Sequence, residues 1–564
     1  MSNAMRHDPS NGLTRRAFLA KTSLAAAGLA VGTRHLSAMT LDARRVLAGI
    51  TPAMCLSEPR DPAVLRHLAT QAMDAATKAG ATYADIRVAE RQYFVMNDQF
   101  GTELEEGFSY GVRVLIDGGW AFVHGTVPTA DAVVAAARGA VAQARQNAAI
   151  VHATLSKSGH SSIQPDVPPF VPAPAVTGEW SIPITVDPFA VPIQDQMALL
   201  VGWNGTGHRH WPAYAFSVLV WRRETRVFAS STGSLVTQHF TRSRSEQYVR
   251  PGRKSGWSEP WVMTQSSVPR SGGYELVADP AIYDQITMAA DETLGYAALP
   301  MGILDVGRYP VVFDGAMMGA ALYTNLGLAL EMDRVLGEEA DSAGTSLLAP
   351  PMDVLGTAIA SPVLTVTADR ALPSYACVKW DDDGVVPRSG PVISAGTLVD
   401  YQTSLTTAPA LAPWYQRHGQ AMTSFGSAVA TEADHPVQVR CGHLTVAPAQ
   451  TATSIDDLIR DMSHGLLIRS GGRPATDQQL SSSSLYDNAM YFEVSRGRVV
   501  KRLMGNGVQW STRPFWKGLT AVGDATTMRG WGDDVAKGQP WHQTLYTTSA
   551  PAGHFKAIDV VSLQ

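Results

Sequence analysis

The sequence predicts an α+β protein, with an N-terminal α/β domain followed by a β-rich C-terminal domain whose antiparallel sheet wraps around one buried central helix. Three observations lead to this fold class. Amphipathic helical patterns gather near the start, strand patterns dominate after residue 361, and the segment 316–330 is apolar on nearly every side. A helix that is apolar all round must be buried. The length of 564 residues also favours two or three domains over one core.

The first predicted domain covers residues 55–160. A helical pattern over 61–78 leads into an alternating strand at 82–89. Strands at 110–116 and 120–123 flank the turn Asp117-Gly118-Gly119, which predicts a β-hairpin. Thr129 can then cap a helix over 130–144. These elements predict a compact α+β domain.

A Ser/Pro-rich connector at 158–175 separates this domain from a middle β-rich and helical segment, 176–300. The C-terminal domain is predicted over 305–564. It begins with the apolar strand 307–313, after which Asp314 stands where a helix N-cap belongs and a buried helix follows over 315–331. Apolar spacing predicts one more helix, 454–464.

Composition excludes several classes of protein. The net charge is −5 and no long run of Lys or Arg occurs, so we expect no nucleic-acid partner. The three cysteines, Cys55, Cys377 and Cys441, form no CxxC pair. A disulfide framework and a four-cysteine zinc site are therefore not expected, and each thiol is interpreted as a small buried apolar group.

Residues 1–40 have the pattern of a processed leader. Met1 to Ala4 resembles a cloning remnant, and Arg15-Arg16 with Phe18-Leu19 precedes a weakly apolar stretch of roughly 11 residues, 22–32. This is a twin-arginine signal peptide by pattern, with a cleavage site after Ala38. It predicts export to the periplasm. No later stretch has 18 uninterrupted apolar residues, so no membrane association is expected of the mature form.

Five landmarks in order resemble the TldD/PmbA family of metallopeptidases, historically called modulators of DNA gyrase. Residues 80–87 resemble its N-terminal strand, and residues 111–122 resemble its hairpin. Residues 310–334 resemble its central strand and helix, residues 381–401 its D-D-E-G segment, and residues 455–466 its late helix. Together they lie within residues 80–466. The composition gives no support to the gyrase name.

The family's zinc site is where this sequence departs from the resemblance. The family helix carries HExxxH, in which two histidines bind zinc and the glutamate polarises the attacking water. The corresponding positions here are Tyr323, Thr324 and Leu328, and the position of the family's third ligand, a cysteine, is near Asp534. None of these residues can do the same work, because a hydrolytic zinc needs about three N, S or O ligands and a base. The resemblance thus implies that this chain holds no catalytic residues, metal or other cofactor of its own, and that zinc belongs to an active partner.

In the family, chains with and without the motif pair into heterodimers that enclose a chamber for unfolded peptide. The resemblance therefore implies that this chain is the non-catalytic subunit, which pairs with a HExxxH-bearing partner or with itself and helps to bind peptide. A periplasmic peptide-binding homodimer without chemistry is a second hypothesis. The residues that bind peptide are not identified by the sequence.

A third hypothesis is a peptidase or hydrolase with a rebuilt metal site at Asp533, Asp534 and His542, near the lost cysteine position. His208 and His210 would share one face of a strand and could bind a metal as a pair, although no third ligand is evident. Asp381-Asp382-Asp383-Gly384 is similar to a cation loop but lacks the spacing of a calcium site, and a turn is the alternative.

Overall fold

The structure is a computed structural model that describes residues 49–562, except 100, 159–169, 208–212, 252–261, 265–268, 470–471, 487–488 and 540. The predicted leader (1–40) lies outside the described residues, as do His208, His210 and most of the predicted connector. Within the described part of the chain, no helix is long and apolar enough to cross a bilayer.

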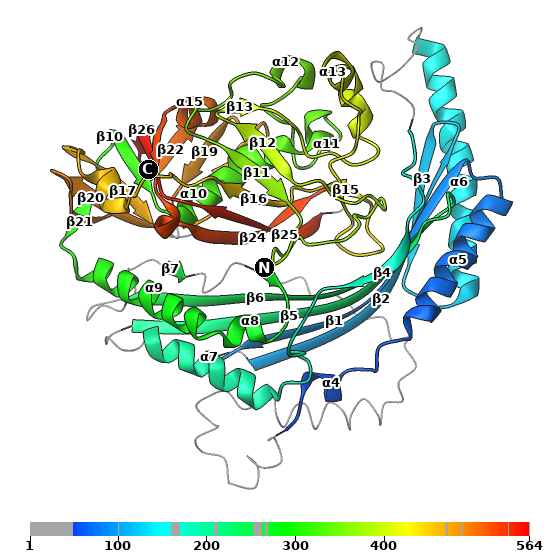
Figure 1. The fold of residues 1–564 in the computed structure, drawn as a ribbon, viewed down its shortest axis with the longest axis horizontal. Coiled ribbons are helices and arrows are strands. Elements are labelled where there is room, and N and C mark those ends of the chain that lie inside the picture. The colour runs from blue at the N-terminus through cyan, green and yellow to red at the C-terminus, as the bar shows by residue number, and fades with distance from the viewer. Residues whose placement is uncertain are drawn as a thin grey trace.

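The first half of the chain builds one long curved sheet (Figure 1). Its strands follow the order β3-β2-β1-β5-β6-β4, with β7 and β8 also paired to β6. The bounds are β1 (Tyr83–Asn97), β2 (Gly101–Ile116), β3 (Gly119–Gly125), β4 (Thr177–Ser181), β5 (Ala213–Ser230), β6 (Leu235–Pro251), β7 (Val262–Thr264) and β8 (Arg270–Ser271). The predicted hairpin is β2–β3, and its turn residues Asp117 and Gly118 both have positive φ, of 45° and 82°.

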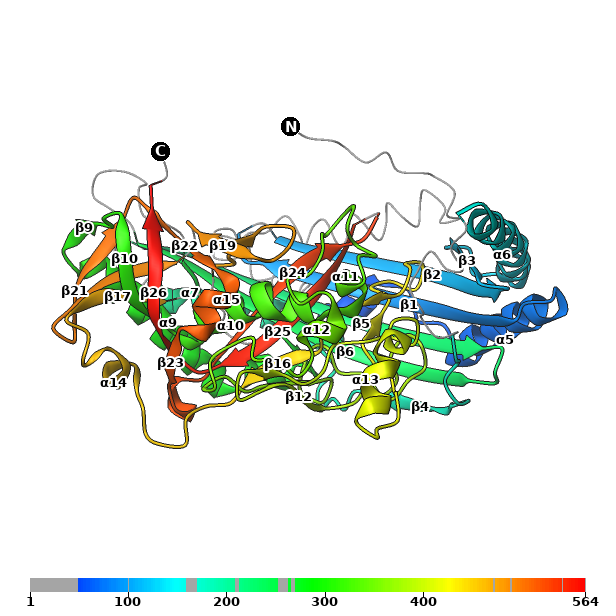
Figure 2. The same ribbon diagram turned by 90° about the horizontal axis from the view of Figure 1, so that it is seen from above.

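Helices cover the outer, apolar face of this sheet. They are α4 (Pro52–Cys55), α5 (Pro62–Lys78), α6 (Ala130–Ser158), α7 (Ile193–Gly207), α8 (Glu275–Ala278) and α9 (Pro280–Ala298). Ile86 and Val227 pack under α5 and α6, while Phe94 and Trp221 pack under α7 and α9. The intervening side chains of the same strands, such as Arg87 and Arg226, point to the opposite face. That concave face is charged and carries the C-terminal domain (Figures 1 and 2).

The C-terminal domain contains two larger sheets. The ten-stranded sheet consists of β9 (Met301–Ile303), β10 (Gly307–Phe313), β17 (His464–Arg469), β18 (Ala475–Thr476), β19 (Ser482–Leu485), β20 (Met490–Ser495), β21 (Arg498–Met504), β22 (Gly507–Ser511), β23 (Leu519–Val522) and β26 (Gly553–Val561). The six-stranded sheet consists of β11 (Val366–Asp369), β12 (Gly390–Ser394), β13 (Thr397–Leu398), β16 (His443–Val446), β24 (Arg529–Lys537) and β25 (His542–Ala550). A small ribbon pairs β14 (Ala428–Val429) with β15 (Gln438–Val439).

The predicted buried helix lies between these two sheets. It is built from α10 (Gly315–Leu322), the π-helical turn η1 (Tyr323–Gly327) and the 3-10 turn η2 (Leu328–Leu330). The other helical pieces of the domain are short: α11 (Met332–Val335), α12 (Pro351–Val354), η3 (Ala408–Leu411), α13 (Ala412–Arg417), α14 (Ile455–Ile459), α15 (Thr512–Lys517) and η4 (Ala525–Thr527). The predicted α+β architecture with a β-rich C-terminal domain and a buried central helix is confirmed.

Three details differ from the sequence prediction. The segments 55–160 and 176–300 share one sheet, because β1 pairs with β5 along most of its length, so they are one structural unit. Both larger sheets of the C-terminal domain are mixed, since β10 runs parallel to β17 and β16 runs parallel to β25. The helix expected at 454–464 stops at Ile459, because His464 already begins strand β17 beside β20.

Candidate functional site

The buried central helix is the first candidate site, because the resemblance places the metal-binding motif on it. Asp314 caps the helix as predicted, and its side chain accepts a hydrogen bond from the Met317 amide at 2.8 Å. The helical stretch then changes from α to π to 3-10 geometry and ends at Glu331, where the backbone becomes extended with ψ of 115°. Tyr323, Thr324 and Leu328 all lie inside the π and 3-10 turns and are buried.

The π turn decides which side chains share a face. The Leu328 amide donates to the Tyr323 carbonyl, which is an i→i+5 hydrogen bond. Residues five apart on a regular α-helix differ in direction by roughly 140°. The wider π turn returns the later residue closer to the direction of the earlier one, and such turns occur often at functional sites. The backbone therefore suits a pair of ligands at 323 and 328, whereas the side chains present do not.

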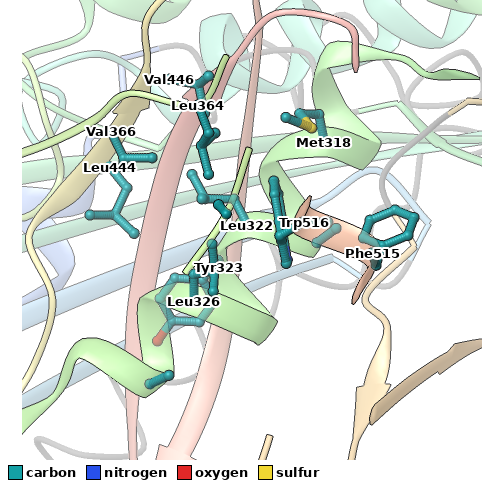
Figure 3. Packing of buried hydrophobic residues seen from close by; sticks show 14 of the residues in the cluster. Met318, Leu322, Tyr323, Leu326, Leu364, Val366, Leu444, Val446, Phe515 and Trp516 are labelled. Carbon is teal, nitrogen blue, oxygen red and sulfur yellow. The ribbon is translucent and has the colours of Figure 1, made fainter. Parts of the chain in front are cut away.

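Aromatic packing occupies the space in front of position 323. The Tyr323 ring lies 4.2 Å from the Tyr546 ring and 5.8 Å from the Trp531 ring, measured between centroids. Figure 3 shows Tyr323 among the apolar side chains of this core. Burial, and then the neighbouring Tyr546 and Glu331, raise the pKa of Tyr323 well above its usual value. The phenol is therefore neutral and would not bind a metal as a phenolate.

Position 324 is occupied by a hydroxyl that makes a hydrogen bond to the helix backbone. Thr324 Oγ1 donates to the Ala320 carbonyl at 2.9 Å, one turn earlier. The next side chain, Asn325, is fully used as well, because its Oδ1 accepts from Trp510 Nε1 at 2.8 Å and its Nδ2 donates to Ser483 Oγ at 2.6 Å. Neither group can act as the general base that a glutamate would supply.

A closed cluster of charges lies directly after the helix. Lys537 on β24 is 1% exposed, and its Nζ donates to Glu331 Oε2 at 2.9 Å and to Asp333 Oδ1 at 2.6 Å. The third hydrogen of the ammonium is directed to the Val439 carbonyl at 2.8 Å. All three donors of this lysine are thus satisfied by buried acceptors.

The remaining carboxylate oxygen of Glu331 is also bound. Glu331 Oε1 accepts from the Tyr546 hydroxyl at 2.8 Å and from the Cys441 amide at 3.2 Å, and Arg440 Nη1 donates to the same tyrosine oxygen at 2.8 Å. The Cys441 thiol donates to the Gly327 carbonyl at 2.9 Å. Burial, followed by the Glu331 carboxylate, raises the pKa of Cys441 well above its usual value, so this thiol stays protonated.

Strand β24 has two faces, and Asp534 lies on the wrong one for the helix. Trp531 and Lys537 project toward the central helix, where they meet Tyr323 and Glu331. Asp534 projects to the other side, and its Oδ2 lies 2.5 Å from Arg244 Nη1 on β6. The assignment of Asp534 to the third ligand position is therefore not supported by the geometry, since its side chain cannot meet those of Tyr323 and Leu328.

The residues of the predicted rebuilt site are likewise separated. Asp533 lies 3.4 Å from Arg473, on the opposite face of the strand from Asp534. His542 stacks on His435 with 3.6 Å between ring centroids, and burial, then His435, lowers the pKa of His542 to about 4. Within the described residues, no three side chains of the His, Cys, Asp or Glu type come close enough to hold a metal ion.

Two family models match this chain. The PmbA/TldA metallopeptidase C-terminal domain matches residues 306–560, and PmbA/TldA metallopeptidase domain 1 matches residues 96–144. The chain belongs to the TldD/PmbA family.

Solved structures share the fold over most of their length. A candidate modulator of DNA gyrase from Thermotoga maritima is 14% identical with a TM-score of 0.63, and the match covers 88% of this chain and 99% of that one. TldE from Thermococcus kodakarensis is 14% identical with a TM-score of 0.61, over 88% and 100% of the two chains. A candidate modulator of DNA gyrase from Bacteroides thetaiotaomicron is 15% identical with a TM-score of 0.60, over 88% and 99%. No curated protein matches the sequence.

The residues at the TldD/PmbA motif do not fit a zinc ion. The pair of ligand positions holds a neutral phenol and an aliphatic chain, Tyr323 and Leu328, and the base position holds a hydroxyl. An ammonium group, that of Lys537, already forms ion pairs with both adjacent carboxylates, those of Glu331 and Asp333. A hydrolytic zinc needs about three N, S or O ligands and an open position. This part of the molecule can therefore support packing and a fixed charge cluster, and no metal chemistry follows from it.

The Asp381–Gly384 loop of this TldD/PmbA chain connects the two halves of the molecule through ion pairs. Asp382 accepts from Arg226 Nη1 at 2.9 Å through both oxygens, and Asp383 accepts from Arg113 Nη2 at 2.6 Å. Arg113 also binds Asp85 at 2.7 Å. The loop therefore holds arginines of the N-terminal sheet, which agrees with the interpretation as a turn and leaves no vacant carboxylates for a cation.

A second polar region, which was not predicted from the sequence, lies between the halves of the molecule. A cavity with about 100 Å³ of internal space lies between the charged face of the N-terminal sheet and the β24–β25 hairpin. Its polar lining consists of Tyr93, Arg222, Arg242, Arg244, Tyr375 and Asp534. The signal was present in the alternation Arg222, Glu224, Arg226, which places three charges on one face of β5.

Proposed function

We propose that this chain is the non-catalytic subunit of an exported TldD/PmbA peptidase assembly that binds unfolded peptide. It would pair with a family member that carries HExxxH and holds the zinc, or with a second copy of itself. The observation that carries the proposal is the content of the motif helix, where Tyr323, Thr324 and Leu328 stand at the ligand and base positions. The closed cluster around Lys537 supports the same conclusion.

The chemical reason is the loss of both halves of the hydrolytic machinery. A bound zinc activates water, and a general base in the active site contributes about 10²–10⁴ in rate. This chain supplies neither group at the motif. What it can supply is the shared fold, which would form one wall of a peptide chamber.

The test is cleavage of an unfolded peptide, measured with and without a chelator. We expect no chelator-sensitive turnover from the chain alone, and turnover when a HExxxH-bearing family member that co-purifies with it is present. Chelator-sensitive cleavage by the pure chain would refute the proposal and favour the rebuilt site at Asp533, Asp534 and His542. A pure homodimer that binds peptide without a family partner would favour the peptide-binding homodimer.

Restoring the motif sharpens this test. The triple variant Tyr323→His, Thr324→Glu, Leu328→His should remain inactive, because two imidazoles are one protein ligand short of a hydrolytic site. Adding Asp534→Cys should not help either, since the side chain at 534 faces Arg244 and not the helix. Circular dichroism and the zinc content of each variant separate a failure to fold from a failure to bind. Zinc-dependent turnover by the quadruple variant would show that the strand is placed differently.

Export is proposed from the leader alone. Arg15-Arg16 should route the folded chain through the twin-arginine pathway to the periplasm. Replacing both arginines by lysine should hold the protein in the cytoplasmic fraction, whereas unchanged export of the variant would contradict the proposal.

A further inference from the structure

The cavity between the charged sheet face and the β24–β25 hairpin is built from side chains that lie opposite one another. Tyr93 on β1, Arg222 on β5 and Arg242 on β6 are direct partners across three neighbouring strands. Tyr375, from the loop after β11, and Asp534, from β24, approach from the C-terminal domain. The cavity is thus assembled by both halves of the molecule, and it has room for about three water molecules or one small polar group.

Two of its three arginines have their charge matched by carboxylates. Arg222 Nη2 donates to Glu224 at 2.6 Å and lies 3.3 Å from Glu432. Arg244 lies 2.5 Å from Glu246 and 2.5 Å from Asp534. These groups therefore need no further counterion.

Arg242 is different. Within the described residues it has no ion pair, and its one hydrogen bond runs from Nη2 to the Cys377 carbonyl at 3.3 Å. Its buried Nε has no hydrogen-bond partner. The guanidinium rests over the Phe240 ring at 4.2 Å and near the Tyr375 ring at 5.3 Å. Burial lowers the pKa of Arg242 by more than the nearby Tyr375 and Glu224 raise it, so the charged form is only partly compensated.

Neutral hydroxyl donors stand beside this unmatched charge. The side chains of Tyr93 and Tyr375 both line the cavity, and neither hydroxyl makes a hydrogen bond within the described residues. Burial raises the pKa of both tyrosines, so both remain protonated and able to donate. A planar guanidinium with adjacent hydroxyls is suited to a planar oxyanion.

We propose that this cavity binds one carboxylate group of a peptide, with Arg242 as its counterion and the Tyr93 and Tyr375 hydroxyls as additional donors. The charge decides the class of ligand. Arg242 is the one arginine of the lining that has no carboxylate within hydrogen-bond distance among the described residues, and Asp534 on the wall already contributes a negative charge, so a monoanion fits better than a phosphate dianion. The choice of a peptide as the source of the carboxylate rests on the proposed function, whereas the carboxylate itself rests on the cavity.

The experiment measures binding of short unfolded peptides to the full chain by calorimetry. Three probes share one sequence: one has a free C-terminus and no acidic side chain, one is amidated and contains a glutamate, and one is amidated with glutamine in its place. Binding of the first identifies a terminal carboxylate, and binding of the second identifies an acidic side chain. The third should not bind.

Two variants assign the binding to the cavity. Arg242→Gln should weaken binding of the carboxylate probe by about tenfold or more, because a charge-assisted bidentate contact is lost. Arg223→Gln is the matched control, since Arg223 lies on the same sheet but faces Asp187 on the other side, and it should leave affinity unchanged. Equal affinity in wild type and Arg242→Gln would overturn the proposal.

Acetate and inorganic phosphate test the carboxylate site separately from the proposed peptide function. If no peptide binds but acetate raises the melting temperature of wild type and not of Arg242→Gln, the carboxylate site stands and the peptide function fails. If phosphate shows the stronger Arg242-dependent effect, the carboxylate assignment is wrong. If neither anion nor any peptide has an effect that depends on Arg242, the cavity is not an anion site.

Discussion

The two faces of the β24–β25 hairpin carry two polar regions that differ in how completely their charged groups are paired. On one face, Lys537 is enclosed by Glu331, Asp333 and a carbonyl, with every donor satisfied. On the other, Arg242 has one long hydrogen bond and no paired carboxylate among the residues that the structure describes. A closed set of charges has nothing left to offer a ligand, whereas the half-buried Arg242 guanidinium still has an N–H group, at Nε, without a partner. The position that the family resemblance singles out is therefore the closed one, and the open one lies outside the motif, on the other face of the hairpin.

Removing the central cation of the closed cluster should have the largest effect on stability. Lys537→Met leaves Glu331 and Asp333 buried without their counterion, which typically costs about 3–5 kcal/mol. Urea denaturation of the full chain measures the change. Lys517→Met is the control, because Lys517 is exposed on α15 and should change the free energy of unfolding by less than about 0.5 kcal/mol. If Lys537→Met lowered the free energy of unfolding by as little as the control does, Lys537 would not be the counterion of Glu331 and Asp333.

Local sequence patterns were sufficient for much of this first region. The Asp314 cap, the helix that follows it and its burial all follow from residues adjacent in the chain. The partners of Glu331 do not, because Lys537 is more than 200 residues away and its contact depends on which face of β24 it occupies. A shift of one residue in strand register reverses that face, so sequence alignment alone does not show whether Asp534 or a neighbouring residue faces the helix.

The cavity region could not be predicted from the sequence, because it depends on strand pairing that local patterns do not indicate. Alternation in β5 shows that Arg222 and Arg226 share a face, but it does not show that β5 lies beside β1. The sequence therefore suggested two segments, 55–160 and 176–300, where the structure has one sheet. The late helix ended early for a similar reason, since pairing of β17 with β10 and β20 overrides the apolar period after Ile459.

The His435–His542 stack, at the edge of the closed cluster, should give a smaller, pH-dependent effect. The His542 carbonyl accepts a hydrogen bond from Arg440 Nη2, and the ring lies near Asp434. The pKa of His542 is lowered to about 4, by burial first and then by His435 and Arg440. The unfolded chain therefore binds more protons between pH 6.5 and 4, so stability is full above pH 6.5 and falls as the pH decreases through this window.

Chemical denaturation at pH 7, 5.5 and 4 tests this expectation. His542→Asn should reduce the acid-dependent loss by about 1–2 kcal/mol relative to wild type. His464→Asn, at an exposed position on β17, should leave the pH profile unchanged. Parallel curves for wild type and His542→Asn would show that the stacked pair is not responsible for the dependence.

The smallest effect should come from the arginine of the open cavity, and it is the most informative. If Arg242 were structural, Arg242→Met would destabilise the protein as strongly as Arg226→Met, which breaks a bidentate pair with Asp382 and should cost about 3 kcal/mol. Because no carboxylate of the described residues pairs with Arg242, replacing it by an apolar side chain of similar length removes a half-buried charge that has no ion pair there. The free energy of unfolding in the absence of carboxylates should then change by less than about 1 kcal/mol, or increase. A loss equal to that of Arg226→Met would show that Arg242 belongs, like Lys537, to a closed structural cluster.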